Sequence, residues 1–238
     1  MELQFLGRGG GLLPEEGNTS AYFIEDGALF LIDCGELIFS KIKQTGLLEK
    51  AQIEEIFCFI THLHSDHVGS LSNLIYYCTF GQKDKKIGFH LVCEDIIAKD
   101  LLPWLYLQGN TSLFDSVATA DLEGKYQSFT SVRFIRTAHS GFFPAFSVEF
   151  ETDAGKVFYS GDTNEIYLIE CYVRQPGIDK MYIEVALDEN VRNVHLMLES
   201  LNEIIPKKLR GKVYLMHFDC IECITEAKKL GFQVVECK

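Results

Sequence analysis

The chain is poor in positive charge, and it lacks both a membrane-length apolar run and a leader-like start. Its 238 residues include 22 lysines and arginines against 34 aspartates and glutamates, which gives a formal net charge of −12. Proteins that bind long nucleic acids usually present a basic face, so this balance argues against a large polyanionic substrate. Residues 1–7 show no basic segment leading into an apolar core. We therefore expect a cytoplasmic protein without a membrane partner.

Other familiar signatures are incomplete. Gly7 to Gly11 form a glycine-rich stretch, but no G-K-[ST] follows, which argues against a P-loop. Cys220 and Cys223 have the C-x-x-C spacing without a second pair, which favours a structural role over a zinc or redox site. Neither a linker nor a repeat divides the sequence. With 47% hydrophobic residues, the chain is predicted to form a single domain over residues 1–238.

The order of apolar patterns predicts a layered fold. We expect strands near residues 2–6, 18–25, 28–33, 53–60, 87–93, 131–137, 145–151, 156–160, 180–185 and 212–216, and helices near residues 36–50, 70–80, 164–173 and 195–205. Strands dominate first and helices then interleave with them. This order predicts an α/β fold of the α+β type, with two packed sheets and helices outside. The less regular segment 95–125 is interpreted as a substrate lid, a dimer contact or a local packing helix.

The densest group of metal-binding residue types follows the expected strand at 53–60. Positions 62–67 hold His62, His64, Asp66 and His67. Because alternation along a loop points these side chains in two directions, two neighbouring metal ions can share them more easily than one ion can. Imidazole and carboxylate ligands suit zinc, with manganese or iron as substitutes. The loop therefore predicts a metal centre at the carboxyl end of a strand.

Three further residues of these types follow other expected strands. They are His139, Asp162 and His217. Side chains at successive strand ends can converge on one rim of a sandwich, so we expect these three to join the first loop. Asp33 ends another strand and is interpreted as a residue that orients a metal-binding histidine. His90 lies within an alternating apolar pattern and is expected to be a core or edge histidine.

This ordered set of motifs resembles the metallo-β-lactamase superfamily. The set comprises the H-x-H-x-D-H loop, the isolated His139, the Gly-Asp-Thr at 161–163 and the late His217. The resemblance spans most of the chain and implies an αββα sandwich with a dinuclear zinc site on one rim. It implies that His62, His64 and His139 hold one zinc ion, that Asp66, His67 and His217 hold the other, and that Asp162 bridges them.

Within that superfamily, the sequence is similar to the phosphodiesterase branch. The stretch 159–163, Glu184 and His195 eleven positions later resemble the tRNA 3′-processing endonucleases (tRNase Z). Arg8 and Gly17 depart from that pattern, and no long Gly/Pro-containing arm for clamping tRNA is present. An acidic chain without an arm resembles instead the anti-Pycsar proteins, which are homodimeric enzymes that cleave cyclic nucleotides.

The resemblance implies a metal-activated water that attacks a phosphodiester. Asp66 would orient that water or accept its proton, and His195, held by Glu184, would protonate the leaving oxygen. The expected substrate is a small phosphodiester, namely a cyclic mononucleotide, and the expected assembly is a homodimer. RNA 3′-end processing is the alternative within the same chemistry, and thioesterase, lactonase and lactamase activities share only the metal loop. A metal-bound sensor without turnover is the alternative from a different class.

Overall fold

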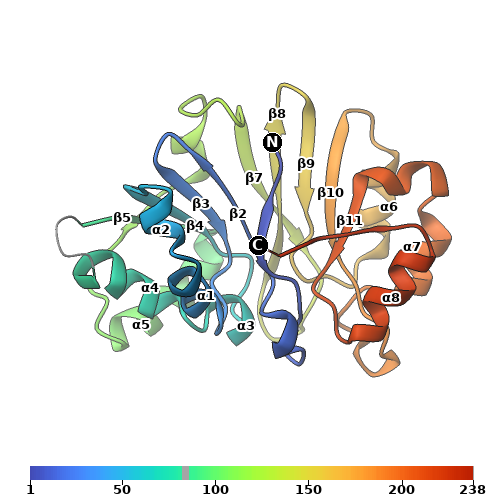
Figure 1. Ribbon diagram of the computed structural model, residues 1–238, viewed down its shortest axis with the longest axis horizontal. Coiled ribbons are helices and arrows are strands. Elements are labelled where there is room, and N and C mark those ends of the chain that lie inside the picture. The colour runs from blue at the N-terminus through green and yellow to red at the C-terminus, as the bar shows by residue number, and fades with distance from the viewer. Residues whose placement is uncertain (82–85, 238) are drawn as a thin grey trace.

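A computed structural model describes residues 1–81 and 86–237 as four layers, with helices on the outer faces of two sheets packed against each other (Figure 1). The first sheet has the strand order β1 (Gln4–Gly7), β2 (Ser20–Glu25), β3 (Ala28–Ile32), β4 (Glu55–Phe59), β5 (Gly88–Val92) and β6 (Asp115–Ser116). The second has the order β12 (Gln233–Val234), β11 (Val213–Met216), β10 (Ile178–Glu184), β9 (Gly155–Tyr159), β8 (Ala145–Thr152) and β7 (Ser131–Thr137). The α/β sandwich expected from the sequence is confirmed.

Each sheet is covered by its own helices, as the left and right sides of Figure 1 show. The first sheet carries α1 (Ile38–Thr45), α2 (Leu47–Lys50), α4 (Leu71–Tyr76) and α5 (Asp95–Leu107), and the second carries α6 (Ile166–Arg174), α7 (Leu198–Ile204) and α8 (Ile221–Lys229). The short α3 (Ser65–Val68) lies at the lower rim. Short 3-10 helices occur at η1 (Pro14–Glu16), η3 (Thr119–Leu122), η4 (Glu189–Val191) and η5 (Lys207–Lys212), and η2 (Tyr77–Gly81) is a π-helix. No helix in the described part of the chain is both long and apolar enough to cross a bilayer.

Strand direction brings several strand ends to one rim. In the first sheet β3, β4 and β5 pair in parallel, and in the second β9, β10 and β11 do so. Strand β7 runs with β9, because both are antiparallel to β8. The candidate site residues lie at or just after the carboxyl ends of five strands, namely β4, β7, β9, β10 and β11. These strand ends lie at one rim of the sandwich.

An aromatic layer joins the two sheets. Phe23 and Phe30 of the first sheet stack with ring centroids 4.5 Å apart, and Phe150 of the second meets Phe23 edge-on at 5.7 Å. All three side chains are buried. Burial of such a side chain contributes about 1.5–3 kcal/mol, and edge-to-face pairs add to this. This packing fixes one sheet against the other, so the rim on which the site lies has a rigid base.

Two expected helices differ from the structure. The helix predicted over residues 36–50 is broken into α1 and α2 by Gly46, whose φ of 64° is left-handed and ends α1. The helix predicted over 195–205 begins only at Leu198, and His195 lies in the preceding turn, where its amide donates to the carbonyl of Val191 at 3.0 Å. The remaining expected strands and helices are present with ends that differ by a few residues.

The segment 95–125 begins with a regular helix. Helix α5 runs through Pro103 and buries Ile97, Leu101 and Leu105 against the first sheet's core. A packing helix therefore accounts for its first half. The lid and dimer-contact interpretations of its exposed face stay predictions.

Candidate metal centre

The loop that follows β4 divides its four candidate ligands between two local conformations. His62 and His64 lie on extended backbone before α3, so their side chains point the same way, as expected. The sequence predicts His67 just before a helix that begins near residue 70. That helix is present as α4, but a further short helix, α3, starts at Ser65 and carries Asp66 and His67. Asp66 and His67 thus belong to a different group of ligand atoms from His62 and His64, although the ring centroids of His62 and His67 lie only 4.0 Å apart.

The first group of ligand atoms comes from β4, β7 and β9. Nε2 of His62 and Nε2 of His139 each lie 3.1 Å from Nδ1 of His64. Oδ2 of Asp162 lies 3.8 Å from the same two Nε2 atoms. Residues from three separate parts of the sequence thus place one possible ligand atom each within 4.8 Å of one another.

The second group adjoins the first through Asp162. Nε2 of His217 lies 3.2 Å from Oδ2 of Asp66 and 3.4 Å from Nε2 of His67. Asp162 faces this group as well, with Oδ1 3.3 Å from His67 and Oδ2 3.4 Å from His217. The structure therefore brings together all seven residues that the sequence analysis selected as candidate ligands, with Asp162 between the two groups.

The geometry and chemistry of both groups fit divalent metal ions. Four ligands at zinc-bond lengths around a tetrahedral ion lie about 3.3 Å from one another, close to the separations found here. Nδ1 of His139 donates to the carbonyl of Val194 at 2.7 Å, and Nδ1 of His67 donates to Asp33 at 2.8 Å. Each neutral ring then presents the lone pair of Nε2 to the group. Lone pairs and carboxylate oxygens that face one another repel unless a cation or a proton lies between them.

Burial and charge set the proton affinities of these groups. Burial lowers the pKa of His139 to about 4 and the pKa of His62 well below its ordinary value. Burial also opposes charge on His67, but the carboxylates of Asp162, Asp66 and Asp33 outweigh it and hold the pKa of His67 well above the ordinary value. The same carboxylates would also stabilise a metal ion, so a proton and a metal ion compete for the second group.

Asp33 contacts the second group through a hydrogen bond to His67. It directly follows β3 in a left-handed conformation with φ of 62° and is fully buried. Its Oδ1 accepts from the amide of Thr61 at 2.9 Å, and its Oδ2 accepts from the Thr61 hydroxyl and from His67 Nδ1, both at 2.8 Å. The predicted contact with a candidate ligand is therefore present. It sets the tautomer and the direction of the His67 ring.

We expect Asp33→Asn to weaken metal binding by about 10- to 100-fold, since loss of such a supporting partner has costs in that range. One of the three donors that meet Asp33 would then face an amide NH2 group. Asp26→Asn is the matched control, because Asp26 also has a positive φ but is exposed in the β2–β3 turn. Titration against a chromogenic chelator measures the effect. Equal metal affinity in the two variants would contradict the role given to Asp33.

Two features beside the groups were missed by the sequence analysis. The glycine-rich stretch lets backbone approach the ligands, because a Cβ on Gly10 would lie 3.1 Å from His217 and one on Gly11 would lie 3.2 Å from Asp66. The ring of Phe143 meets His64 edge-on with centroids 4.6 Å apart. The glycine spacing does not match a P-loop and indicates no other role, and no local pattern marks an aromatic residue as a neighbour of a distant histidine.

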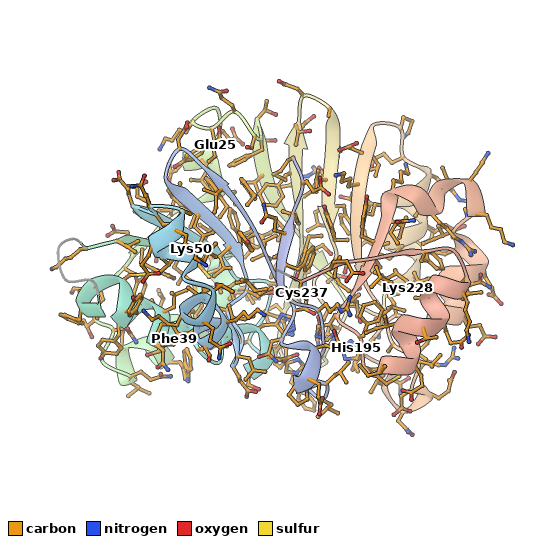
Figure 2. The ribbon with its side chains drawn as sticks, viewed as in Figure 1. Glu25, Phe39, Lys50, His195, Lys228 and Cys237 are labelled. Carbon is orange, nitrogen blue, oxygen red and sulfur yellow. The ribbon has the colours of Figure 1, made fainter. Side chains whose placement is uncertain are left out.

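Glu184 and His195 form a pair beside the second group. Glu184, the last residue of β10, is fully buried, and its Oε2 accepts from His195 Nδ1 at 2.9 Å. Its Oε1 accepts from the amide of Thr163 at 2.6 Å. Burial opposes charge on His195, but the Glu184 carboxylate outweighs burial and raises the pKa of His195 to about 9. Figure 2 labels His195 at the lower rim of the sandwich, where it lines a cavity of about 60 Å³ with His217 and the Gly10–Gly11 backbone.

An αββα sandwich with clustered histidines and aspartates at its strand-end rim defines a metallo-β-lactamase-fold hydrolase. The metallo-beta-lactamase fold protein YhfI from Bacillus subtilis has this fold and aligns with a TM-score of 0.68 at 16% identity, covering 98% of this chain and 94% of that one. The chain belongs to the anti-Pycsar protein Apyc1 family, whose model matches residues 1–236.

Individual relatives agree with this assignment. The anti-Pycsar protein Apyc1 of Paenibacillus sp. (strain J14) is 29% identical over 234 residues, covering 92% of this chain and 89% of that protein. Ribonuclease Z of Geobacillus kaustophilus (strain HTA426) is 43% identical over 79 residues, which cover 32% of this chain and 25% of that protein. The sequence likeness to ribonuclease Z is thus strong over a limited stretch, whereas the sequence likeness to Apyc1 extends along the chain.

Proposed function

We propose that this protein is a dinuclear zinc phosphodiesterase that hydrolyses cyclic mononucleotides. The observation that carries the proposal is the position of Asp162 between two adjoining groups of ligand atoms, in a chain of the anti-Pycsar family. Manganese or iron can replace zinc at ligands of these types. The proposed ligands are His62, His64 and His139 for one ion, Asp66, His67 and His217 for the other, and Asp162 for both.

When bound, such an ion pair supplies an activated water near neutral pH and neutralises charge on the attacked phosphate. Asp66 and Asp162 would orient that water or accept its proton. Glu184 holds Nδ1 of His195, so the proton that His195 delivers to the leaving oxygen is the one on Nε2. The buried Glu184 carboxylate also keeps the ring in one orientation, because its other oxygen is fixed by the Thr163 amide.

The charges around the site support a small substrate. The described residues that line the cavity beside His195 include no lysine or arginine. Arg8, which follows β1, is held by Glu16 at 2.6 Å and by the carbonyl of Val235 at 2.9 Å. A polynucleotide would need cationic side chains along its backbone, whereas the metal ions alone can neutralise the single phosphodiester of a cyclic nucleotide.

A substrate panel on zinc-loaded protein tests the proposal. We expect 3′,5′-cyclic mononucleotides to be opened to nucleoside monophosphates, as resolved by chromatography, while precursor tRNA is left uncut. Cyclic dinucleotides in the same panel define the upper size of the substrate. Cleavage of precursor tRNA at a higher kcat/KM than any cyclic mononucleotide would favour RNA 3′-end processing instead. That second candidate is kept because of the local identity to ribonuclease Z.

We infer in addition that the enzyme works as a cytoplasmic homodimer. All eight cysteines are free thiols, in keeping with a reducing compartment. Phe80, Tyr106 and Leu107 expose 67%, 48% and 89% of their surface on the α4–α5 side, and large exposed apolar side chains favour a contact between copies. Light scattering of the purified protein tests the assembly, and a monomer at micromolar concentration would contradict it.

A further inference from the structure

The loop between β10 and α7 carries His195 near its end. Its two ends are joined, because the amide of Ala186 donates to the carbonyl of Leu196 at 2.8 Å and the amide of Leu198 donates back to Ala186 at 3.0 Å. The residues between them, 187–195, leave the sandwich and return to it. Positions 187–190 are exposed, so little side-chain packing fixes the start of this loop.

A single carboxylate holds the start of the loop. Oδ2 of Asp219 accepts from the amide of Leu187 at 2.8 Å and from the amide of Asp188 at 2.6 Å. Asp219 comes two residues after His217, at the end of β11, which is the neighbour of β10 in the sheet. Hydrogen bonds to an ionised carboxylate are stronger than those between neutral groups. The loop is therefore tied to the same strand end that provides a candidate metal ligand.

The far end of the loop contacts the centre at two adjacent residues. The carbonyl of Val194 accepts from Nδ1 of His139 at 2.7 Å, and His195 follows directly with its bond to Glu184. The carbonyl of Asn193 accepts from the side-chain amide of Asn164. The ring centroids of His139 and His195 lie 5.0 Å apart. A shift of the loop would therefore move His195 relative to the centre.

We infer that Asp219 is a positioning residue for His195. By fixing the first two amides of the loop, its carboxylate determines where the loop returns to the centre and where the imidazole of His195 lies. Asp219 lines the same cavity as His195, and its Oδ2 contacts the two loop amides rather than His195. The inference rests on the proposed role of His195 as the proton donor. It adds that the position of His195 depends on Asp219, which follows β11.

This role has a kinetic signature that depends on the leaving group. Opening a cyclic nucleotide expels a ribose alkoxide, which must take up a proton as the P–O bond breaks. Hydrolysis of bis(p-nitrophenyl) phosphate expels p-nitrophenolate, which is stable without that proton. Displacement of His195 should therefore slow the first reaction much more than the second. Loss of metal or of folded protein would slow both.

The experiment compares Asp219→Ala with Asp219→Asn in the full-length, zinc-loaded protein. We expect Asp219→Ala to lower kcat on cyclic mononucleotides about 10- to 100-fold, as for a small misplacement of a catalytic group, with less than about a threefold change on bis(p-nitrophenyl) phosphate. Asp219→Asn keeps an oxygen that can accept from both amides, so its rates should stay within about threefold of the unmodified protein. Hydrogen exchange of the 186–196 peptide should be faster only in the alanine variant.

The outcomes separate this inference from the proposed function. Equal losses on both substrates, or lost zinc in Asp219→Ala, would assign Asp219 to the metal site or the fold and overturn the inference. Unchanged exchange and unchanged kcat would overturn it as well. His195→Ala is measured in parallel. If His195→Ala shows the leaving-group dependence and Asp219→Ala does not, only the inference about Asp219 fails. If neither variant shows the leaving-group dependence, the proton-donor role of His195 fails as well.

Discussion

Replacement of Asp162 by alanine is expected to lower kcat/KM for cyclic nucleotides by about 10³-fold or more, with a matching loss of bound metal. Metal ions contribute several kcal/mol to the stabilisation of such transition states, and each 1.36 kcal/mol corresponds to a factor of ten. Asp162 supplies atoms within 3.8 Å of His62 and His139 on one side and within 3.4 Å of His67 and His217 on the other. Its loss should therefore affect both ions rather than one.

Metal content by elemental analysis and initial rates provide the two measurements for this variant. Asp153→Ala is the matched control, because Asp153 is exposed in the β8–β9 turn, away from the centre. Circular dichroism establishes that both variants fold. Retention of two metal ions with activity within about tenfold of the unmodified protein would show that Asp162 does not bridge, since loss of a bridging ligand should exceed that range.

The candidate centre could be predicted from the sequence because its residues occupy strand ends. Hydrophobic runs indicate where strands stop, and parallel strands present their carboxyl ends at one rim. His139 and Asp162 were selected by this reasoning, although 77 and 100 positions separate them from His62 (139 − 62 and 162 − 62). Their side chains converge as expected. The resemblance to a known superfamily then divided the seven residues into two sets. Two groups of neighbouring side chains contain the same residues, and a third joins Asp162, His195 and His217, so the division between two ions stays a prediction.

Other parts of the site depend on contacts without a local sequence pattern. Gly10 and Gly11 pack on the ligands, and Asp219 accepts from the start of the His195 loop, yet glycine and aspartate are common in ordinary turns. The same limit explains the errors in helix ends. The apolar spacing over 36–50 is helical on both sides of Gly46, and only the backbone conformation of that glycine separates the two helices.

The electrostatic environment of Glu184 links the fold to the proposed chemistry. Burial raises the pKa of Glu184, while the adjacent His195 opposes that rise. A buried carboxylate that must be neutralised by one histidine favours the protonated form of that histidine. The Glu184 carboxylate therefore stabilises the proton on His195 that the ring would deliver to the leaving oxygen.

His195→Ala is expected to lower kcat on cyclic nucleotides by about 10²- to 10⁴-fold, the range for loss of a general acid, while both metal ions stay bound. The smaller effect should again appear with bis(p-nitrophenyl) phosphate, whose leaving group needs no proton. Glu184→Gln should reproduce part of the loss, because the amide can still contact Nδ1 but no longer balances a charged ring. His90→Gln is the matched control, since His90 stacks on Phe57 with centroids 4.6 Å apart and lies on β5, outside the centre.

The alternative role for His195 is that of a metal ligand. Nδ1 of His195 lies 3.9 Å from Oδ2 of Asp162, and His195 forms a third possible metal-binding group with Asp162 and His217. If His195→Ala loses one metal ion and slows both substrates alike, His195 is a ligand and the leaving oxygen must obtain its proton elsewhere. If both ions remain and only the alkoxide-expelling reaction slows, the hydrogen bond to Glu184 has the function proposed here, because a ligand role cannot produce that selectivity.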